Sequence, residues 1–242
     1  MIYKTAEIAK LIGVHPNTVR FYEEMGLLPT VPRNEKGYRI FNHIHLKQLR
    51  LLRTAFRAEI ISSKLRQEAI GIIKRAAQGD CDGAYLDTEK YLEHLKEEKE
   101  KAEEAIRITI SIVENTNTWD DKPVFYGRKE MAGILGITID VLRDWERNGL
   151  IQVPHDKKGY RQYGLKEINR LKIIRILRNA NYSIMSILRM LKGLDSGQMN
   201  LKEFIDTPAA DEDIVCATDR YITALNMAQN DAVEMMNIIK SI

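Results

Sequence analysis

The chain has 242 residues, of which 44% are hydrophobic and 29% charged, and its formal net charge is +3. That length accommodates two domains of roughly 100–150 residues each, and no apolar run approaches the roughly 18–20 residues that a membrane span requires. Two cysteines, Cys81 and Cys216, are too few for a disulfide framework, and the first residues lack a secretory signal, so we expect a cytoplasmic protein.

The charge is distributed unevenly along the chain. Residues 1–60 carry ten Lys and Arg against five Asp and Glu, and residues 119–182 carry thirteen against eight. Residues 85–118 and residues 183–242 each carry five against nine. Two basic segments that alternate with two acidic ones are typical of a protein with two surfaces that face a polyanion.

The first basic segment predicts two short helices joined by a tight turn. Apolar residues at helical spacing end at Gly13, which stops the first helix. The second helix starts with Pro16, a residue that the first helical turn tolerates, and runs to Met25 before Gly26 ends it. Two short helices around a glycine turn form a helix-turn-helix.

A wing and two further helices are predicted next. Pro29, Pro32 and Gly37 indicate a turn, and the alternating residues 38–41 indicate a short strand, so that together they predict a β-hairpin. A longer helix with one apolar face follows, and an amphipathic helix is predicted over roughly 62–77. The apolar face of the longer helix consists of Leu46, Leu49, Leu52 and Phe56.

The same series occurs a second time. Arg20-Phe21-Tyr22-Glu23 recurs at a shift of 123 as Arg143-Asp144-Trp145-Glu146, and Gly37-Tyr38-Arg39 recurs at a shift of 122 as Gly159-Tyr160-Arg161. The difference of one residue falls between these two anchors, where a loop absorbs it. The duplication predicts a second helix-turn-helix with its own wing and following helices.

Each unit then ends in a predicted long helix, over 87–116 and over 211–242. Their apolar residues alternate in steps of three and four, which is typical of coiled-coil seams. We expect the two helices to pair antiparallel within one chain. The predicted seam residues are Leu92, Leu95, Ala102, Ile106 and Val113 in the first helix, and Tyr221, Leu225, Ala228, Ala232, Met235 and Ile239 in the second.

The predicted fold class is therefore mainly α, with two winged helix-turn-helix domains, each followed by a long coiled-coil helix. We expect the first domain to span residues 1–80 and its coiled-coil helix with linker to span 85–118. The second domain is expected over 123–195, and the C-terminal connection and coiled-coil helix over 198–242.

These elements and their motifs resemble the MerR family of transcription regulators. The resemblance rests on Arg20-Phe21-Tyr22-Glu23, Gly26-Leu27 and Gly37-Tyr38-Arg39-Ile40-Phe41, and it covers essentially the whole chain as two units in tandem. It implies a bacterial, nucleoid-associated regulator that bends and untwists promoter DNA to realign it for RNA polymerase. Ordinary members of the family are homodimers joined by an antiparallel coiled coil, and they bind near-palindromic operators.

The candidate contacts to double-stranded DNA lie on the second helix and the wing of each unit. From the predicted recognition helices, Arg20 and Arg143 can reach a guanine edge or a phosphate. For Tyr22 and Trp145, contact with the DNA backbone and packing against the wing are both open. The complete set is Asn17, Thr18, Arg20, Tyr22, Arg33, Tyr38 and Arg39 in the first unit, and Arg143, Trp145, Arg147, Lys157, Lys158, Tyr160 and Arg161 in the second.

The two units differ at positions that would face DNA. Phe21 corresponds to Asp144, and Arg33 corresponds to His155, which stands beside Asp156. A carboxylate where phosphate is expected weakens the predicted grip of the second unit without abolishing it. We therefore expect two modules of unequal strength or sequence preference in one pseudo-dimeric chain that can read an asymmetric site. A homodimer with four modules is the alternative.

Other function classes find less support in the sequence. There is no nucleophile–base pattern and no phosphate-binding glycine loop, so we expect no enzyme activity and no cofactor. Each unit has a single cysteine without a second soft ligand nearby, which argues against a metal site. The alternatives are a helical protein that sequesters a drug or metabolite and a nucleoid-structuring DNA-binding protein. The sequence leaves the effector, the operator and the direction of regulation open.

Overall fold

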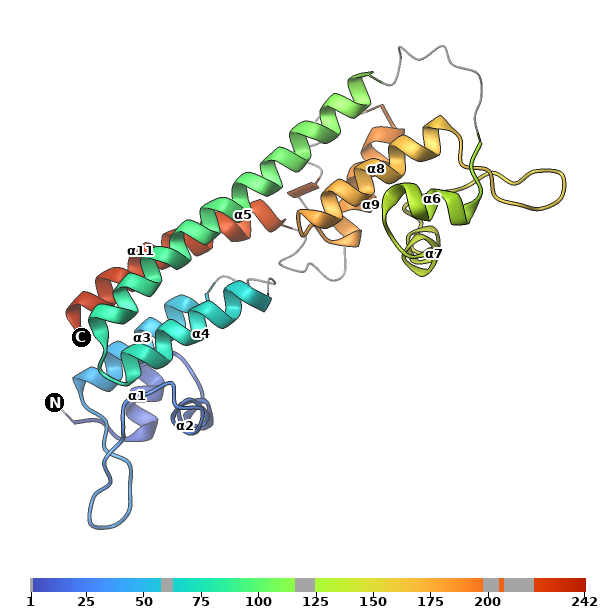
Figure 1. Ribbon diagram of the computed structural model, residues 1–242. Coiled ribbons are helices and arrows are strands. Elements are labelled where there is room, and N and C mark those ends of the chain that lie inside the picture. Colours follow the sequence, from blue (N-terminus) through green and yellow to red (C-terminus); the bar gives the residue numbers. More distant parts are fainter. Residues whose placement is uncertain (1, 58–62, 116–124, 198–204, 207–219) are drawn as a thin grey trace. The chain divides into compact units, whose positions relative to one another are not determined.

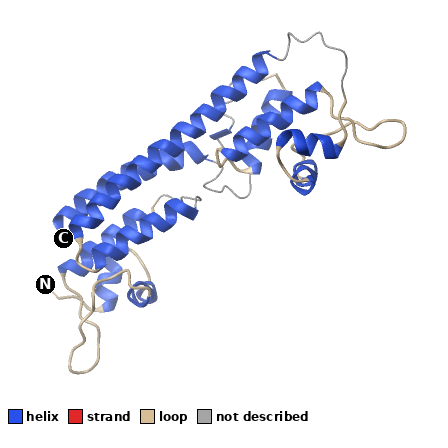
Figure 2. Cartoon of the chain, in the orientation of Figure 1, coloured by secondary structure: helices blue, strands red, loops and turns tan. Residues whose placement is uncertain are grey.

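The computed structural model describes residues 2–57, 63–115, 125–197, 205–206 and 220–242. Its contacts divide the chain into two compact units, one formed by Met1–Glu98 with Ala224–Ile242 (unit 1) and the other by Lys99–Thr223 (unit 2). Within the described residues every regular element is a helix, and β structure is limited to isolated bridges (Figures 1 and 2). The predicted mainly α fold with two helix-turn-helix modules is confirmed.

The first module begins with the predicted helix-turn-helix. Helix α1 (Thr5–Ile12) ends at Gly13, whose φ of 70° lies in the left-handed region that favours glycine. Helix α2 (Pro16–Glu24) follows at once, because His15 caps its start by accepting the backbone N–H of Asn17 at 3.2 Å. The turn between the helices is therefore determined locally by one glycine and one capping side chain.

The wing of the first module is a hairpin with a single bridge. Arg33 pairs with Arg39 as an isolated antiparallel bridge, and the Asn34 side chain accepts the backbone N–H of Lys36 and of Tyr38. The predicted short strand is wrong, because Arg39 and Phe41 form only isolated bridges, to Arg33 and to Tyr3. The hairpin itself is present, and backbone hydrogen bonds such as that from the Ile40 N–H to the Pro32 C=O stabilise it together with the asparagine.

Helices α3 (His43–Ala55) and α4 (Ser63–Ala77) complete the first module, and its hydrophobic core lies between α3 and the helix-turn-helix. Ile8, Val19, Phe41 and Leu49 are all fully buried there. The equally buried Gln48 donates its amide to the Leu27 C=O at 3.1 Å and to the Ile73 C=O at 2.8 Å. These bonds connect α3 to the end of the recognition helix and to α4.

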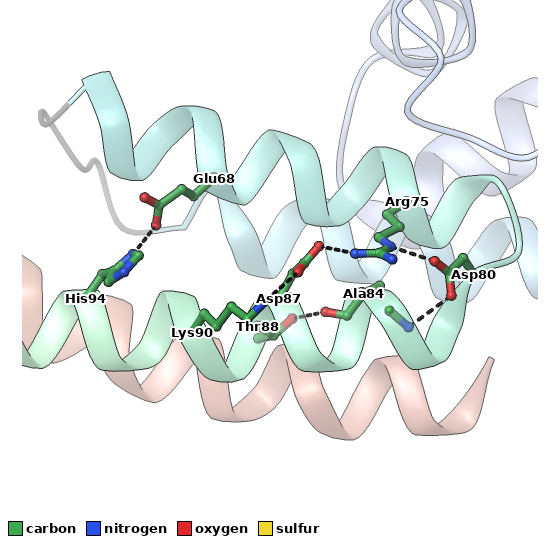
Figure 3. A network of polar contacts seen from close by, with 9 residues as sticks. Glu68, Arg75, Asp80, Ala84, Asp87, Thr88, Lys90 and His94 are labelled. Carbon is green, nitrogen blue, oxygen red and sulfur yellow. Dashed lines mark hydrogen bonds and ion pairs between the residues drawn. The ribbon is translucent and has the colours of Figure 1, made fainter.

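Helix α5 (Cys81–Asn115) starts six residues before the predicted position. The Asp80 side chain accepts the Gly83 N–H at 2.9 Å and its backbone C=O accepts the Ala84 N–H, so Asp80 starts the helix. Arg75 of α4 binds Asp80 at 2.5 Å and Asp87 at 2.7 Å, which connects the two helices (Figure 3). Hydrogen bonding to Arg75, and then to the Gly83 N–H, holds the pKa of Asp80 below its ordinary value.

Helix α11 (Tyr221–Ser241) runs antiparallel to the first half of α5 within unit 1 (Figure 1). Lys240 lies over the Tyr85 ring, 4.6 Å from its centre, while Gln229 donates to the Leu95 C=O at 3.3 Å. Residue numbers thus fall along one helix as they rise along the other, as expected for the pair. The start of the predicted helix, over residues 211–219, lies outside the described residues.

Burial along the two long helices follows the predicted seams closely. Leu95, Ala102 and Ile106 of α5 are buried, whereas Leu92 and Val113 are half-buried. Tyr91 is 2% exposed and takes the inward position that the prediction gave to its neighbour Leu92. The α11 seam residues Tyr221, Leu225, Ala228, Ala232, Met235 and Ile239 are all buried.

Unit 2 repeats the order of elements of the first module. Helices α6 (Arg128–Leu135) and α7 (Ile139–Arg147) form the second helix-turn-helix, and α8 (Leu165–Asn179) and α9 (Ile184–Asp195) follow its wing. Thr138 caps α7 by accepting the Val141 N–H at 3.2 Å. The wing is again closed by an isolated bridge, here between His155 and Arg161.

A buried tyrosine connects the second module to the later half of α5. Tyr182, between α8 and α9, is fully buried and donates its hydroxyl to the Ala102 C=O at 3.2 Å. Its ring meets the Tyr221 ring edge-on, with centres 5.6 Å apart. In unit 1 the corresponding connection is ionic, because Arg57, just after α3, pairs with Asp231 and Glu234 of α11, each at 3.0 Å.

Candidate nucleic-acid interface

The recognition helix of the first module presents its arginine to solvent. Arg20 is exposed, and its Nη1 donates to the Asn17 amide oxygen at 3.0 Å, one helical turn earlier. Thr18 is half-buried, and Phe21 beside Arg20 is 54% exposed. The surface of α2 therefore combines a guanidinium held by a neutral partner with an exposed aromatic ring.

An acid on the same helix holds the wing. Glu23 of α2 is paired with the wing residue Arg39, and Arg33 approaches it at 3.5 Å. Tyr38, between the two arginines in the hairpin, is 68% exposed. The Glu23 carboxylate thus keeps two wing guanidinium groups beside the recognition helix.

In the second module the recognition-helix arginines have acidic partners. Arg143 donates to Asp140 at 2.9 Å, and Arg147 pairs with Asp144 at 3.1 Å. All four side chains are exposed, each pair being one turn apart on α7. The exposed charges of this helix therefore cancel along its own surface.

The acid that holds the wing in the second module has three partners. Glu146 accepts Arg161 of the wing at 2.6 Å, Arg128 of α6 at 3.1 Å and the Tyr163 hydroxyl at 2.6 Å. Its side chain is only 13% exposed. Burial and the hydrogen bond to Glu146 raise the pKa of Tyr163 to about 12, so Tyr163 remains a donor at neutral pH.

Sequence reasoning missed Arg128 and Tyr163 as members of this cluster. They occupy the positions of Thr5 and Phe41 in the first module, where neither side chain can extend the cluster in this way. The available signal was a pair of polar replacements at matching positions of the repeat. Both replacements contact Glu146, which matches Glu23 of the first module.

A cavity of about 580 Å³ opens between α7 and the wing of the second module. Its walls carry four arginines and a histidine and only one acid, so it can accept an anion of phosphate size. The lining residues are Arg128, Arg143, Glu146, Arg147, Ile151, Gln152, Val153, His155 and Arg161. The structure therefore brings the predicted residues Arg143, Arg147 and Arg161 to one place.

Two aromatic candidates on the recognition helices differ in burial. Trp145 is 5% exposed, as expected for the packing alternative, and its contact with DNA stays a prediction. The physical reason is that α7 turns this position toward the core, beside the fully buried Leu142. Tyr22, its counterpart, is half-buried and packs against the core of the first module.

The wing tips of both modules are exposed to solvent. Tyr160 is 70% exposed, and Lys157 and Lys158 are exposed beside it, with Asp156 accepting the backbone N–H of Lys158 and of Tyr160 at 2.8 Å. Asp156 thus shapes the second hairpin, as Asn34 shapes the first. Arg33, Tyr38, Lys157, Lys158 and Tyr160 are thus exposed, whereas Arg39 and Arg161 are half-buried.

Among the described residues, no group of three or more His, Cys, Asp and Glu side chains is arranged to hold a metal ion. Within that part of the chain, no helix has the length and apolarity to cross a membrane. Cys81 is a half-buried free thiol, and Cys216 lies outside the described residues.

Comparisons with known proteins identify both modules. Residues 4–41 match the family described as MerR family regulatory protein, and residues 126–194 match the family described as MerR HTH family regulatory protein. The HTH-type transcriptional regulator YfmP of Bacillus subtilis is 33% identical over 106 residues, which cover 42% of this chain and 68% of YfmP.

Other relatives match a shorter part of the chain. The HTH-type transcriptional regulator CueR of Escherichia coli is 44% identical over 50 residues, which cover 21% of this chain and 37% of CueR. The chain thus spans less than half the length of that relative. The crystal structure of HiNmlR, a MerR family regulator lacking the sensor domain, bound to promoter DNA, overlaps at a TM-score of 0.31 with 23% identity, covering 58% of this chain and 99% of HiNmlR.

Proposed function

The chain belongs to the MerR family of regulatory proteins, and from this premise we propose that it is a transcription regulator that binds double-stranded promoter DNA in the bacterial cytoplasm. One observation carries the proposal. In each module an acid of the recognition helix, Glu23 or Glu146, binds the wing arginine that follows it, Arg39 or Arg161. Helix and wing are thus held as one surface, on which a duplex can be gripped at two points.

The charges of this surface support DNA as the partner. Arg20, Arg33 and the exposed wing tip lie together in the first module, and the second adds Lys157 and Lys158 to its arginine-lined cavity. Phosphate contacts from such cations release counterions from the duplex, so affinity should fall steeply as salt rises. A protein that sequesters a small molecule would show no such duplex binding.

We further propose that the two modules act as an intramolecular pseudo-dimer. The antiparallel contacts of α5 with α11 support this, since they supply within one chain the pairing that separate subunits provide in a homodimer. In this proposal residues 1–80 and 123–195 bind DNA, whereas 85–118 and 198–242 form the coiled-coil elements. Unequal modules would read an asymmetric site, bend and untwist it, and present it to RNA polymerase.

Footprinting of the full chain on bacterial promoter DNA, followed by affinity measurements at several salt concentrations, tests the first proposal. Wild type should protect one site, and Arg20→Ala should weaken binding to it. Protection that is unaffected by both Arg20→Ala and Arg143→Ala would contradict the assigned surface. Light scattering tests the pseudo-dimer, for which the expected mass is that of one chain, 27.9 kDa. A tight species of twice that mass would contradict it.

A further inference from the structure

A second cavity lies in unit 2, away from the recognition surface. It has a volume of about 490 Å³ and is formed by the end of α5, the start and middle of α8 and the end of α9. Pockets for small organic ligands usually measure about 300–1,000 Å³. The cavity is therefore large enough for a molecule of drug or metabolite size.

The walls of this cavity are mainly apolar. Ile112 and Val113 come from α5, and the buried Ile173 and Leu191 come from α8 and α9. Leu194 adds to the same wall. A ligand that fills the space would remove its own apolar surface from water, which is the main source of affinity in such pockets.

The polar groups of the cavity leave one positive charge in excess. Arg170 pairs with Asp195 at 2.8 Å, and Lys166 stands on the rim as an exposed side chain. In the described part of the chain, Lys166 has neither a hydrogen-bond acceptor nor an ion-pair partner. The group most suited to this rim is therefore an anion, carried on an otherwise apolar molecule.

The matching place in the first module is covered by protein. Lys47 corresponds to Asn169 of the cavity, and its ammonium group donates to the Ser241 C=O at the end of α11. Leu51 corresponds to Ile173 and is fully buried. The end of α11 thus packs on α3 in unit 1, whereas in unit 2 the end of α5 leaves space over α8.

Arg170 connects the cavity to the recognition helix. Its Nε donates to the Leu150 C=O at 2.7 Å, three residues after α7 ends. The counterpart Gln48 makes the same bond to Leu27 in the first module, but it is fully buried and carries no charge. In the second module the residue that holds the end of the recognition helix also lines a cavity, whereas Gln48 is enclosed in the first.

From these observations we propose that this cavity binds a hydrophobic organic anion, and that its occupant acts on the second recognition helix through Arg170. The binding site stands on the cavity alone. The action on the recognition helix rests on the proposed DNA-binding function. An anion that draws Arg170 from Asp195 would displace the guanidinium that holds Leu150, and it would therefore lower the DNA affinity of the second module.

The site is tested by titrating the full chain with 8-anilinonaphthalene-1-sulfonate, a hydrophobic monoanion whose fluorescence rises in apolar surroundings. Thioflavin T, an apolar cation, serves as the comparison probe. We expect one site per chain that prefers the anion. Lys166→Glu should weaken anion binding about fivefold, as expected when an exposed attractive charge is replaced by a repulsive one. Lys172→Glu makes the same charge change on an exposed residue of α8 outside the cavity, and it should leave binding unchanged.

A second variant tests the cavity by volume instead of charge. Leu165→Trp enlarges a wall residue that is 42% exposed at the start of α8, so the fold should tolerate it. It should reduce binding of the anion, and circular dichroism should report unchanged helix content. Anion binding that resists both Leu165→Trp and Lys166→Glu, or equal responses to Lys166→Glu and Lys172→Glu, would overturn the site.

The action on the recognition helix needs a separate measurement. The affinity of the full chain for its footprinted duplex should fall in the presence of the anion, and Arg170→Gln, which introduces the residue of the first module, should abolish this response. Anion binding at the cavity without any change in DNA affinity would overturn the action through Arg170 and leave the site standing. A chain that binds the anion but no duplex would contradict the proposed function instead.

Discussion

The two recognition helices place their arginines in different electrostatic settings on the same scaffold. Arg20 of α2 is held by the Asn17 amide at 3.0 Å, and Arg143 of α7 is held by the Asp140 carboxylate at 2.9 Å. Asn17 and Asp140 occupy the same position of the repeat. The geometry of the contact is thus preserved, while the charge that a DNA phosphate would encounter differs. A single residue of the recognition helix can therefore change the DNA affinity of a module without changing its fold.

The glutamates that hold the wings are the same residue type in both modules but differ in their number of partners. Glu23 and Glu146 have the same role in both modules, yet Glu146 gains Arg128 and the Tyr163 hydroxyl as additional partners. The second module therefore connects helix, wing and α6 through one nearly buried carboxylate. The arginines of its recognition helix have acidic partners, unlike Arg20 of the first module, and more hydrogen bonds connect its helix, wing and α6.

The largest effect is expected from removing this carboxylate charge. Glu146→Gln should lower the free energy of unfolding of the second module by about 2–3 kcal/mol, because two arginines and a tyrosine hydroxyl lose their common anionic acceptor. Glu23→Gln should cost the first module about 1 kcal/mol, since Arg33 is 48% exposed and approaches Glu23 only to 3.5 Å, and within the described residues no tyrosine hydroxyl joins the pair. Hydrogen exchange of the α2 and α7 amides measures both modules in one sample. Equal losses would show that Arg128 and Tyr163 add nothing to the cluster.

The next effect concerns DNA affinity. Arg20→Ala should lower the affinity for the footprinted site about tenfold, within the range of about 1–3 kcal/mol for a base-reading arginine. Arg143→Ala should lower it less, because Asp140 already neutralises part of that charge. Fluorescence anisotropy with a labelled duplex gives both values under one salt condition. A larger loss for Arg143→Ala would reverse the proposed order of the modules.

The sequence predicted the scaffold well because its signals are local. Gly13 and Gly136 terminate the first helix of each module in the left-handed conformation, and the predicted inward positions of α11 are all buried. Such features depend on backbone sterics and periodicity, which a single sequence displays directly.

The parts that the sequence did not predict depend on contacts between distant residues. Trp145 was open to two interpretations, since only the packed module shows which face of α7 is covered. The partners Arg128 and Tyr163 are 18 and 17 residues from Glu146, and the repeat marks them only as unexplained differences. The cavity beside Arg170 depends on where the end of α5 stops covering α8, which no spacing pattern reveals.

A smaller effect is expected from exchanging the partners of the recognition arginines. Asp140→Asn gives α7 the pair found in α2, and it should raise DNA affinity about threefold by removing a carboxylate close to the duplex. Asn17→Asp is the reciprocal change, and it should lower affinity by a similar factor. Competition binding on one duplex measures the two variants side by side. Changes of the same sign in both variants would mean that these partners do not determine the difference.

The smallest expected effect is a difference between the modules in how their stability depends on pH. The Nδ1 of His45 lies 3.1 Å from the Asn42 backbone N–H nitrogen and 2.7 Å from the Asn42 side-chain oxygen, and its Nε2 lies 3.3 Å from the Thr30 C=O. Burial lowers the pKa of His45 below its ordinary value of 6.5, and the hydrogen bond to Thr30 and the charge of Glu23 offset this only in part. Its counterpart in the second module is Glu167, which caps α8 by accepting the Gly164 N–H at 3.0 Å.

A histidine with a lowered pKa in the folded state makes the unfolded chain bind more protons as the pH falls through 6.5. The contribution of His45 to stability is therefore fully present above pH 6.5. It is lost progressively below that value, until the folded pKa is also passed. Hydrogen exchange of the α3 amides at pH 7.5 and 5.5, corrected for the intrinsic rate, should show this loss, and His45→Gln should remove it. If α3 and α8 lost protection equally and His45→Gln changed neither, the asymmetry of the modules would not extend to their response to pH.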